Sequence, residues 1–349
     1  MDRAQLDSAL AAFDDPVLGD ALPELLVEAR LADGVWQLEF ALDFAAQRYA
    51  IDLRERLQAR IPGCQVSIRW QISPQPVQGS LERMPGVGNM IAVASGKGGV
   101  GKSTVAANLA LALAAEGARV GMLDADIYGP SQPRMLGVEG ARPEVVDNKK
   151  MLPVNASGIA LMSIGLLVDA AQPTIWRGPM VTQALAQMLG ETRWPELDYL
   201  IIDLPPGTGD TQLSLAQRIP VSGAVVVTTP QEIALLDARK GLAMFQKVGV
   251  SILGIVENMG VHVCSHCGHE DPVFGTDGGA RMAQQYGVPL LGSLPLDARI
   301  QRQADAGTPT VLAEPDGELA GRYREMALRT AFQLSRAGMA EFPEIVVED

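Results

Sequence analysis

The sequence predicts a doubly wound α/β fold with a mostly parallel sheet, preceded by a small α+β domain. From residue 90 on, short apolar segments without a polar face alternate with helical stretches. Strands of this kind are buried on both sides, as in a parallel sheet covered by helices. A glycine-rich loop directly follows the first segment, at the sheet edge where such folds bind ligands. The segments are Ile91–Ser95, Val120–Asp124, Tyr199–Asp203, Ala224–Thr229, Ile252–Glu257 and Leu290–Leu294.

The small domain is expected over residues 1–75. Its clearest strands are Val35–Phe40, which alternates apolar and polar residues, and Cys64–Trp70, and helical patterns precede and separate them. The stretch 72–80 has the Pro, Gly, Ser and Gln composition of a linker. We therefore predict a linker over 76–89, a large domain over 90–340 and an acidic tail over 341–349.

The glycine-rich loop matches G-x-x-x-x-G-K-[ST] between a strand and a helix, which predicts an ATP and Mg²⁺ site. Its glycines let backbone N–H groups turn toward phosphates where a Cβ would obstruct them. Lys102 is expected to neutralise phosphate charge and to act in catalysis, and the Ser103 hydroxyl is expected to bind Mg²⁺. The predicted binding residues of the loop are Gly96, Gly98, Gly99, Val100, Gly101, Lys102, Ser103 and Thr104.

Three carboxylates lie at the ends of two of the predicted strands. Asp124 ends the Val120–Asp124 segment, Asp126 follows two residues later, and Asp203 ends Tyr199–Asp203. An Asp at a strand end is often only a turn or helix-capping residue. Beside a phosphate loop, however, the carboxyl ends of parallel strands form the ligand site, so these carboxylates are expected to serve the nucleotide.

Cysteine and histidine are concentrated in one loop. Cys264, Cys267 and all three histidines fall within residues 262–269, and only Cys64 lies elsewhere. A C-x-x-C turn presents two thiolates to a metal, whereas a thiolate zinc site or an Fe–S cluster usually takes four ligands. Two copies of the chain, related by a twofold axis, would supply four.

The composition excludes several classes of protein. The net charge of −13 disfavours nucleic acid and anionic membranes as partners. No apolar run approaches the ~20 residues of a membrane span, and the start of the chain is unlike a signal peptide. With only three cysteines, the sequence predicts a protein of the reducing cytoplasm.

Five motifs together resemble the Mrp/ApbC family of iron–sulfur cluster carrier proteins, P-loop NTPases within the deviant Walker A superfamily of MinD, ParA and the nitrogenase iron protein. The motifs, spread from about residue 80 to about residue 335, are G-K-G-G-V-G-K-S-T, L-D-A-D-I-Y-G-P-S, D-L-P-P-G-T-G-D, V-E-N-M and C-x-x-C-G. The resemblance implies an ATP-dependent scaffold or carrier that binds a labile [4Fe–4S] cluster between two protomers. It also implies slow ATP hydrolysis, an upstream Fe–S donor and apo-proteins as recipients.

The resemblance also implies residue roles. Lys97, the second lysine of the loop, would reach across a homodimer to the partner's nucleotide, as an arginine finger does. Asp126 would orient or activate water, with Asp124 nearby on the Mg²⁺ side, and Asp203 would hold Mg²⁺ through water. Asn258 would bind adenine. Cys264 and Cys267 would bind the cluster.

Residues 1–75 resemble the MIP18-like (DUF59) domain that precedes the ATPase in bacterial members, notably in Asp15–Gly19. Where many such domains carry a cysteine after the second strand, this chain reads Leu-Asp-Phe-Ala-Ala over Leu42–Ala46. Cys64 is interpreted as an inert buried thiol.

Alternatives remain for the cysteine pair and for the whole chain. The pair could hold structural zinc together with His262, His266 or His269, or form a redox dithiol. The chain as a whole could be a MinD/ParA-type positioning ATPase. Such relatives need a basic amphipathic helix or a basic DNA-binding face, whereas this chain ends in acidic residues.

Overall fold

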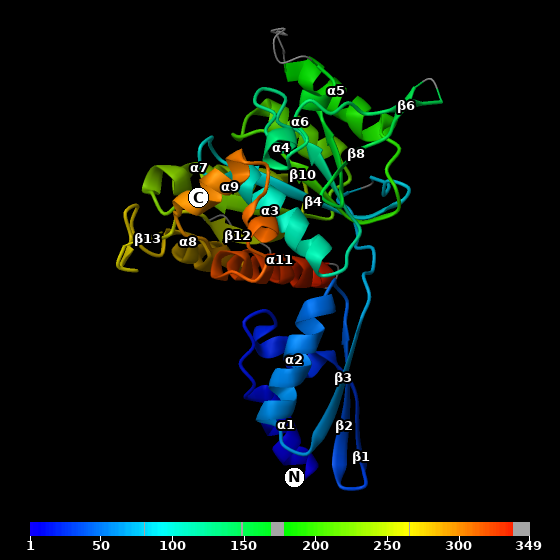
Figure 1. Ribbon diagram of the computed structural model, residues 1–349, viewed down its shortest axis with the longest axis vertical. Helices are drawn as coiled ribbons and strands as arrows, with labels where there is room; N and C mark the ends of the chain where they lie inside the picture. The colour runs from blue at the N-terminus through cyan, green and yellow to red at the C-terminus, as the bar shows by residue number, and fades with distance from the viewer. Residues whose placement is uncertain (80, 148, 169–177, 265, 338–349) are drawn as a thin grey trace, which may run out of the picture.

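The N-terminal part of the chain folds around a three-stranded sheet of order β1-β2-β3 (Figure 1). The computed structural model describes residues 1–79, 81–147, 149–168, 178–264 and 266–337, so the predicted tail over 341–349 lies outside it. The three strands are β1 (Leu26–Ala32), β2 (Val35–Leu42) and β3 (Cys64–Trp70). β2 runs antiparallel to β1 and parallel to β3.

Helices cover one face of this small sheet. They are α1 (Arg3–Ala11), the 3-10 helix η1 (Gly19–Leu25) and α2 (Gln47–Arg60). Alternate residues of β2 are buried against them, among them Leu38 and Phe40. The sequence did not predict β1, because both of its faces are partly exposed and it lacks a clear alternation.

The large domain is built on an eight-stranded sheet, which confirms the predicted doubly wound α/β class. All neighbouring strands pair in parallel except β8, which runs antiparallel to β9 at the edge. In sheet order the strands are β15 (Leu290–Ser293), β12 (Ile252–Glu257), β11 (Gly223–Thr228), β4 (Val87–Ser95), β10 (Leu197–Asp203), β5 (Val120–Asp124), β9 (Ile159–Ser163) and β8 (Val154–Ala156). Two small hairpins lie outside this sheet: β6 (Val145–Val146) with β7 (Lys150–Met151), and β13 (His262–Val263) with β14 (Glu270–Asp271).

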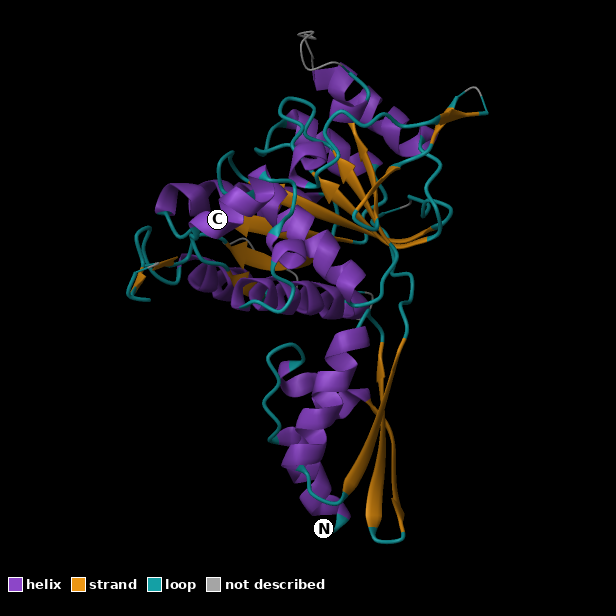
Figure 2. Ribbon diagram, viewed as in Figure 1, coloured by secondary structure: helices purple, strands orange, loops and turns teal. Residues whose placement is uncertain are grey.

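Helices pack on both faces of the large sheet, as Figure 2 shows. Alternate residues of the central strand β4 point to opposite sides: Ile91 and Val93 join the core formed with α3 and α11, and Ala92 and Ala94 join the core formed with α5, α6 and α7. This is why the strand carries no polar face. The helices of this domain are α3 (Lys102–Ala115), α4 (Gln132–Met135), the 3-10 helix η2 (Ile164–Leu166), α5 (Gly178–Glu191), α6 (Asp210–Arg218), α7 (Glu232–Lys247), α8 (Gly278–Tyr286), α9 (Ala298–Asp305), α10 (Thr310–Ala313) and α11 (Glu318–Arg336).

The two parts of the chain meet at the end of α3 and along α11. The buried carboxylate of Glu116 accepts hydrogen bonds from the backbone N–H groups of Arg48 and Tyr49, in the first turn of α2. The ring of Phe44 packs edge-on against that of Phe332 in α11. Across the described ranges, no helix combines the length and apolar character that a membrane span requires.

Candidate functional site

The phosphate loop connects β4 to α3 and requires glycine at several points. Gly99 and Gly101 have φ values of 81° and 83°, in the left-handed region. A Cβ on Gly96 would lie 2.2 Å from the backbone carbonyl carbon of Asp237 in α7. A Cβ on Gly98 or Gly99 would meet nothing within 4 Å, so this side of the loop is an open cradle. The loop ends at the N-terminus of a 14-residue helix, which favours an anion.

Lys102 and Asp203 form a buried ion pair beneath this cradle. The side chain of Lys102 is only 6% exposed, and its ammonium group contacts one carboxylate oxygen of Asp203 and lies 3.3 Å from the Ser103 hydroxyl. The strands β4 and β10 are paired in parallel, which brings the loop and Asp203 to the same edge of the sheet. The structure therefore brings together the lysine, hydroxyl and carboxylate that the sequence predicted to serve Mg·ATP.

Gln132 joins this group, although the sequence analysis did not single it out. Its Nε2 donates to Asp203 Oδ2 at 2.8 Å and to the backbone carbonyl of Ser103 at 3.0 Å. Its Oε1 and the nearby Ser131 hydroxyl are buried with no hydrogen-bond partner among the described residues. Gln132 is the first residue of α4, and no periodicity in the sequence predicts the path of the loop that leads from β5 to this short helix.

Asp124 shapes that loop from within. Its fully buried carboxylate accepts hydrogen bonds from the backbone N–H groups of Asp126, Ser131 and Gln132 and from the Ser163 hydroxyl, at 3.0–3.2 Å. Burial, and then the nearby charge of Asp203, raise the pKa of Asp124 to about 7. These contacts are with the protein itself, and the expected place of Asp124 on the Mg²⁺ side stays a prediction.

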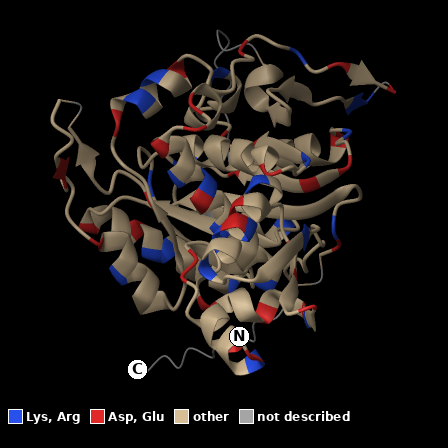
Figure 3. Ribbon diagram, turned by 60° about the horizontal axis from the view of Figure 1, so that its bottom comes forward, with Lys and Arg blue, Asp and Glu red and all other residues tan. Residues whose placement is uncertain are grey.

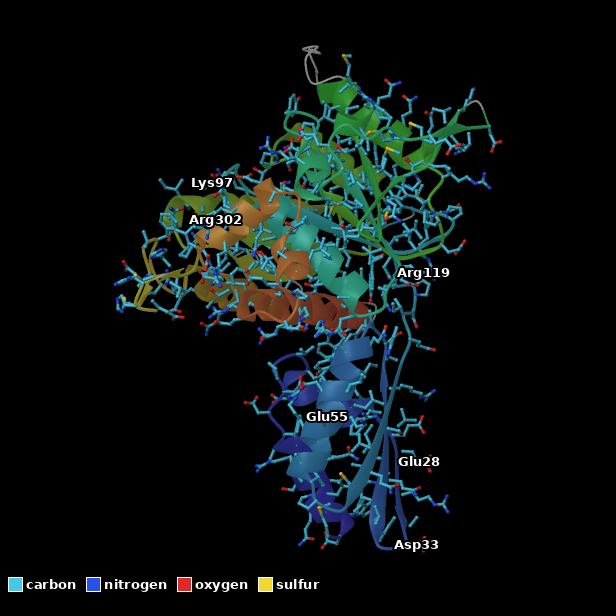
Figure 4. The ribbon with its side chains drawn as sticks, viewed as in Figure 1. Glu28, Asp33, Glu55, Lys97, Arg119 and Arg302 are labelled. Atoms are coloured by element: carbon cyan, nitrogen blue, oxygen red, sulfur yellow. The ribbon has the colours of Figure 1, made fainter. Side chains whose placement is uncertain are left out.

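Asp126 and Lys97 are more open than the buried pair. Asp126 is half-buried and accepts a hydrogen bond from the Gly129 N–H at 3.3 Å, and burial raises its pKa. The half-buried Lys97 has no ion-pair partner among the residues described. Figure 4 places Lys97 at the side of the large domain opposite Arg119.

Asn258 lies against the phosphate loop. Its side-chain amide donates to the backbone carbonyl of Val100 at 2.9 Å, and a Cβ on Gly101 would lie 2.2 Å from the same nitrogen. In this structure Asn258 therefore supports the loop. Its expected contact with adenine stays a prediction.

The cysteine pair lies at the end of the β13–β14 hairpin, which projects from the left of the large domain in Figure 1. Cys264 is half-buried and Cys267 is exposed. The Cys264 N–H donates to His269 and the Cys264 carbonyl accepts from Gly268, both at 2.9 Å, so the turn is closed by its own backbone. The backbone N–H groups of His266 and Cys267, and then the Cys267 thiol, lower the pKa of Cys264.

Cys64 lies apart from this pair. It is buried in the small domain at the start of β3, and burial raises the pKa of its thiol. Within the part of one chain that the structure describes, no three His, Cys, Asp or Glu side chains gather into a metal site.

The chain is similar to known P-loop NTPases in sequence and in fold. Residues 86–331 match the ParA family model, described as NUBPL iron-transfer P-loop NTPase. The "Iron-sulfur cluster carrier protein" of Escherichia coli (strain K12) is 51% identical over 343 residues, which cover 95% of this chain and 92% of that protein. A nucleotide-binding protein from Archaeoglobus fulgidus, solved in complex with ADP, is 38% identical with a TM-score of 0.59, covering 68% of this chain and 92% of its own. The cell division ATPase MinD of Pyrococcus furiosus, 24% identical with a TM-score of 0.51 and covering 69% of this chain and 98% of its own, shares the fold.

Proposed function

This chain belongs to the ParA family of NUBPL-type iron-transfer P-loop NTPases, and on that premise we propose that it is an ATP-hydrolysing iron–sulfur cluster carrier. Two protomers hold one labile [4Fe–4S] cluster as cargo between their cysteine hairpins. The dimer receives the cluster from an upstream donor and passes it to apo-proteins. Its free thiols suit the reducing cytoplasm, which we propose as its compartment.

The thiol pair of Cys264 and Cys267 is the observation that carries this proposal. The thiolate is the form that binds metal, and the backbone N–H groups that lower the pKa of Cys264 favour that form. The pair is accessible at the end of a projecting hairpin, as the delivery of a cargo requires. Because a cubane takes four thiolates, two hairpins related by a twofold axis would supply the complete set.

The phosphate loop fits ATP with Mg²⁺. The open side of the loop at Gly98 and Gly99 leaves room for phosphate oxygens beside the helix N-terminus. Ser103 and Asp203 would hold Mg²⁺, and the buried Oε1 of Gln132, to which no described residue donates a hydrogen bond, leaves a polar atom for solvent or ligand there. When bound, Mg²⁺ neutralises phosphate charge, and the ammonium group of Lys102 supplies one further positive charge.

Hydrolysis would depend on two further residues. Asp126, held by the Gly129 N–H, is in a position to orient a water molecule, and its raised pKa brings it closer to the working range of a base. The side chain of Lys97 forms no ion pair with a described residue of its own chain, which leaves its charge for the nucleotide of the partner subunit.

Zinc is the second candidate cargo, because the same four thiolates would hold it. A positioning ATPase is disfavoured by the 51% identity to an iron–sulfur cluster carrier, against 24% to MinD. In the view of Figure 3 basic and acidic residues are intermixed, and the net charge is −13. Neither feature favours a DNA or anionic membrane surface as partner.

Anaerobic reconstitution with iron and sulfide tests the proposal. We expect a [4Fe–4S] chromophore in the parent protein and in Cys64→Ala, and its loss in Cys264→Ala and in Cys267→Ala, with ATP binding retained in all four. The loaded parent protein should then activate an apo [4Fe–4S] enzyme. A parent protein that retains only zinc after reconstitution, or a loaded protein that activates no apo-enzyme, would overturn the carrier function.

A further inference from the structure

The segment between β12 and β13 touches both functional regions of the chain. It runs from Glu257, the last residue of β12, to Gly260, two residues before β13 begins at His262. We call Glu257–Gly260 the connecting turn. The phosphate loop lies on one side of this turn, and the base of the cysteine hairpin lies on the other.

On the first side, the connecting turn holds the phosphate loop through a side chain. The Asn258 amide donates to the Val100 carbonyl at 2.9 Å. A Cβ on Gly101 would lie 2.2 Å from that amide nitrogen and 3.8 Å from Met259 Cε. The last residues of the phosphate loop before Lys102 are therefore packed directly on Asn258 and Met259.

On the other side, the turn holds the segment that follows the hairpin. The buried Glu257 carboxylate accepts a hydrogen bond from the Gly279 N–H at 2.6 Å, in the first turn of α8, and one from the Ser293 hydroxyl at 3.1 Å. A Cβ on Gly279 would lie 2.8 Å from Glu257 Cβ, so the two backbones are in close approach. The hairpin begins two residues after the turn, and α8, which follows the hairpin after the segment 272–277, is hydrogen-bonded to Glu257.

The backbone of the turn leaves little room for adjustment. Met259 has a φ of 59°, a left-handed conformation that a residue with a side chain rarely adopts. A Cβ on Gly260 would lie 2.4 Å from the Ser293 hydroxyl. The Gly260 N–H also donates to the Leu294 carbonyl at 2.9 Å. A shift of the phosphate loop against Asn258 would accordingly move the hairpin instead of being absorbed within the turn.

We propose that the connecting turn couples the occupancy of the phosphate loop to the position of the Cys264–Cys267 thiols, with Glu257 and Met259 as its positioning residues. This inference rests on the proposed function, because it supplies the link by which ATP acts on the cluster site. The two bonds that define the link are Asn258 to Val100 and Gly279 to Glu257. Both lie within one chain, so the coupling operates in a single protomer.

Thiol reactivity in the cluster-free, full-length protein tests the coupling. In a Cys64→Ala background, the alkylation rate of the hairpin thiols is measured with and without Mg²⁺ and a non-hydrolysable ATP analogue. The protein concentration is one at which sedimentation gives a monomer in both conditions, so that subunit contact cannot shield the thiols. We expect nucleotide to change the rate by about fivefold or more. Glu257→Ala should bring the ratio of the two rates close to one while the analogue still binds.

Matched variants separate coupling from general damage. Glu257→Gln keeps an acceptor for the Gly279 N–H and should restore the parent ratio. Ser293→Ala removes only the second hydrogen bond to Glu257, so this variant should keep the parent ratio of alkylation rates. Met259→Gly makes the backbone of the connecting turn more flexible, so nucleotide should no longer change the alkylation rate. This variant tests the coupling if Glu257→Ala does not fold.

Two results would overturn the inference: no effect of nucleotide on the parent thiols, or a parent-like ratio in the folded variants Glu257→Ala or Met259→Gly. Cluster loading and delivery do not enter this measurement. A failed coupling test would therefore leave the carrier function standing, and a failed delivery test would leave the coupling standing.

Discussion

The phosphate loop and the cysteine hairpin differ in how much of each site one chain completes. The phosphate loop lies between a nine-residue strand and a 14-residue helix. Lys102 is buried and forms an ion pair with Asp203. The hairpin has two strands of two residues each, and its thiols are half-buried or exposed. The difference teaches that one chain arranges the residues of its phosphate loop by itself, whereas under the proposed function its two thiols would need those of a second copy to hold a cluster.

The largest effect is expected from Lys102→Ala in the phosphate loop. It removes the charge that faces the phosphates and leaves the buried Asp203 carboxylate unpaired. We expect nucleotide binding to be abolished and the free energy of unfolding to fall by about 3–5 kcal/mol, as for other broken buried pairs. Isothermal titration and chemical denaturation measure the two effects. Lys97→Ala is the matched control in the same loop and should change the stability by less than ~0.5 kcal/mol. Equal losses in the two variants would contradict a buried, paired Lys102.

Asp126→Ala should separate binding from turnover. Because Asp126 is half-buried and its hydrogen bond with Gly129 lies within its own loop, ATP should still bind, while hydrolysis falls about 10²–10⁴-fold through the loss of water positioning. Asp126→Asn keeps an oxygen to accept from the Gly129 N–H but has no carboxylate. Parent-like hydrolysis in Asp126→Asn would show that the residue serves the loop and not the water.

Mixing two inactive variants tests whether Lys97 acts on the nucleotide of the partner subunit, as proposed above. Lys97→Ala and Lys102→Ala should each hydrolyse little ATP alone. In a mixed dimer, one site has an intact Lys102 and receives an intact Lys97 from the other subunit. An equal mixture should therefore regain roughly a quarter of the parent rate, since half of the dimers are mixed and each has one complete site. An active Lys97→Ala homodimer would place Lys97 outside catalysis, and two inactive homodimers with no recovery on mixing would place it in the site of its own subunit.

The smallest effect on stability is expected from the hairpin. Cys267 is exposed, so Cys267→Ala should change the free energy of unfolding by less than ~0.5 kcal/mol while the ability to hold a cluster is lost. Denaturation of the cluster-free parent protein and of the variant, side by side, measures this. A loss comparable to that of Lys102→Ala would mean that the hairpin is a structural element of the fold.

The parts that the sequence predicted are those specified by local patterns. The segments Val120–Asp124 and Ile252–Glu257 coincide with β5 and β12 because they are short apolar runs without a polar face. Cys64–Trp70 coincides with β3 because its apolar and polar residues alternate. The glycine-rich loop was recognisable because its glycines and its lysine have fixed spacing. The short strands β8 and β9 were missed, since apolar character over three to five residues does not distinguish a strand from a loop.

The contacts that depend on loop paths could not be predicted. Gln132 reaches Asp203 across 71 positions of sequence, and Asn258 reaches Val100 across 158. No periodicity connects such residues, since they meet only after the parallel strands have aligned their carboxyl ends. The same holds for Glu257, which the sequence presents as an ordinary strand end and the structure ties to α8.

The iron content of the loaded dimer tests the central claim most directly. After anaerobic reconstitution, the protein is separated by size, and iron, sulfide and protein are measured in the dimer fraction and in the monomer fraction. A cubane held by Cys264 and Cys267 of two subunits predicts one cluster per dimer, about two irons per chain, with the cluster confined to the dimer. Four irons per chain, or a cluster that stays with the monomer, would contradict a site completed by the second copy.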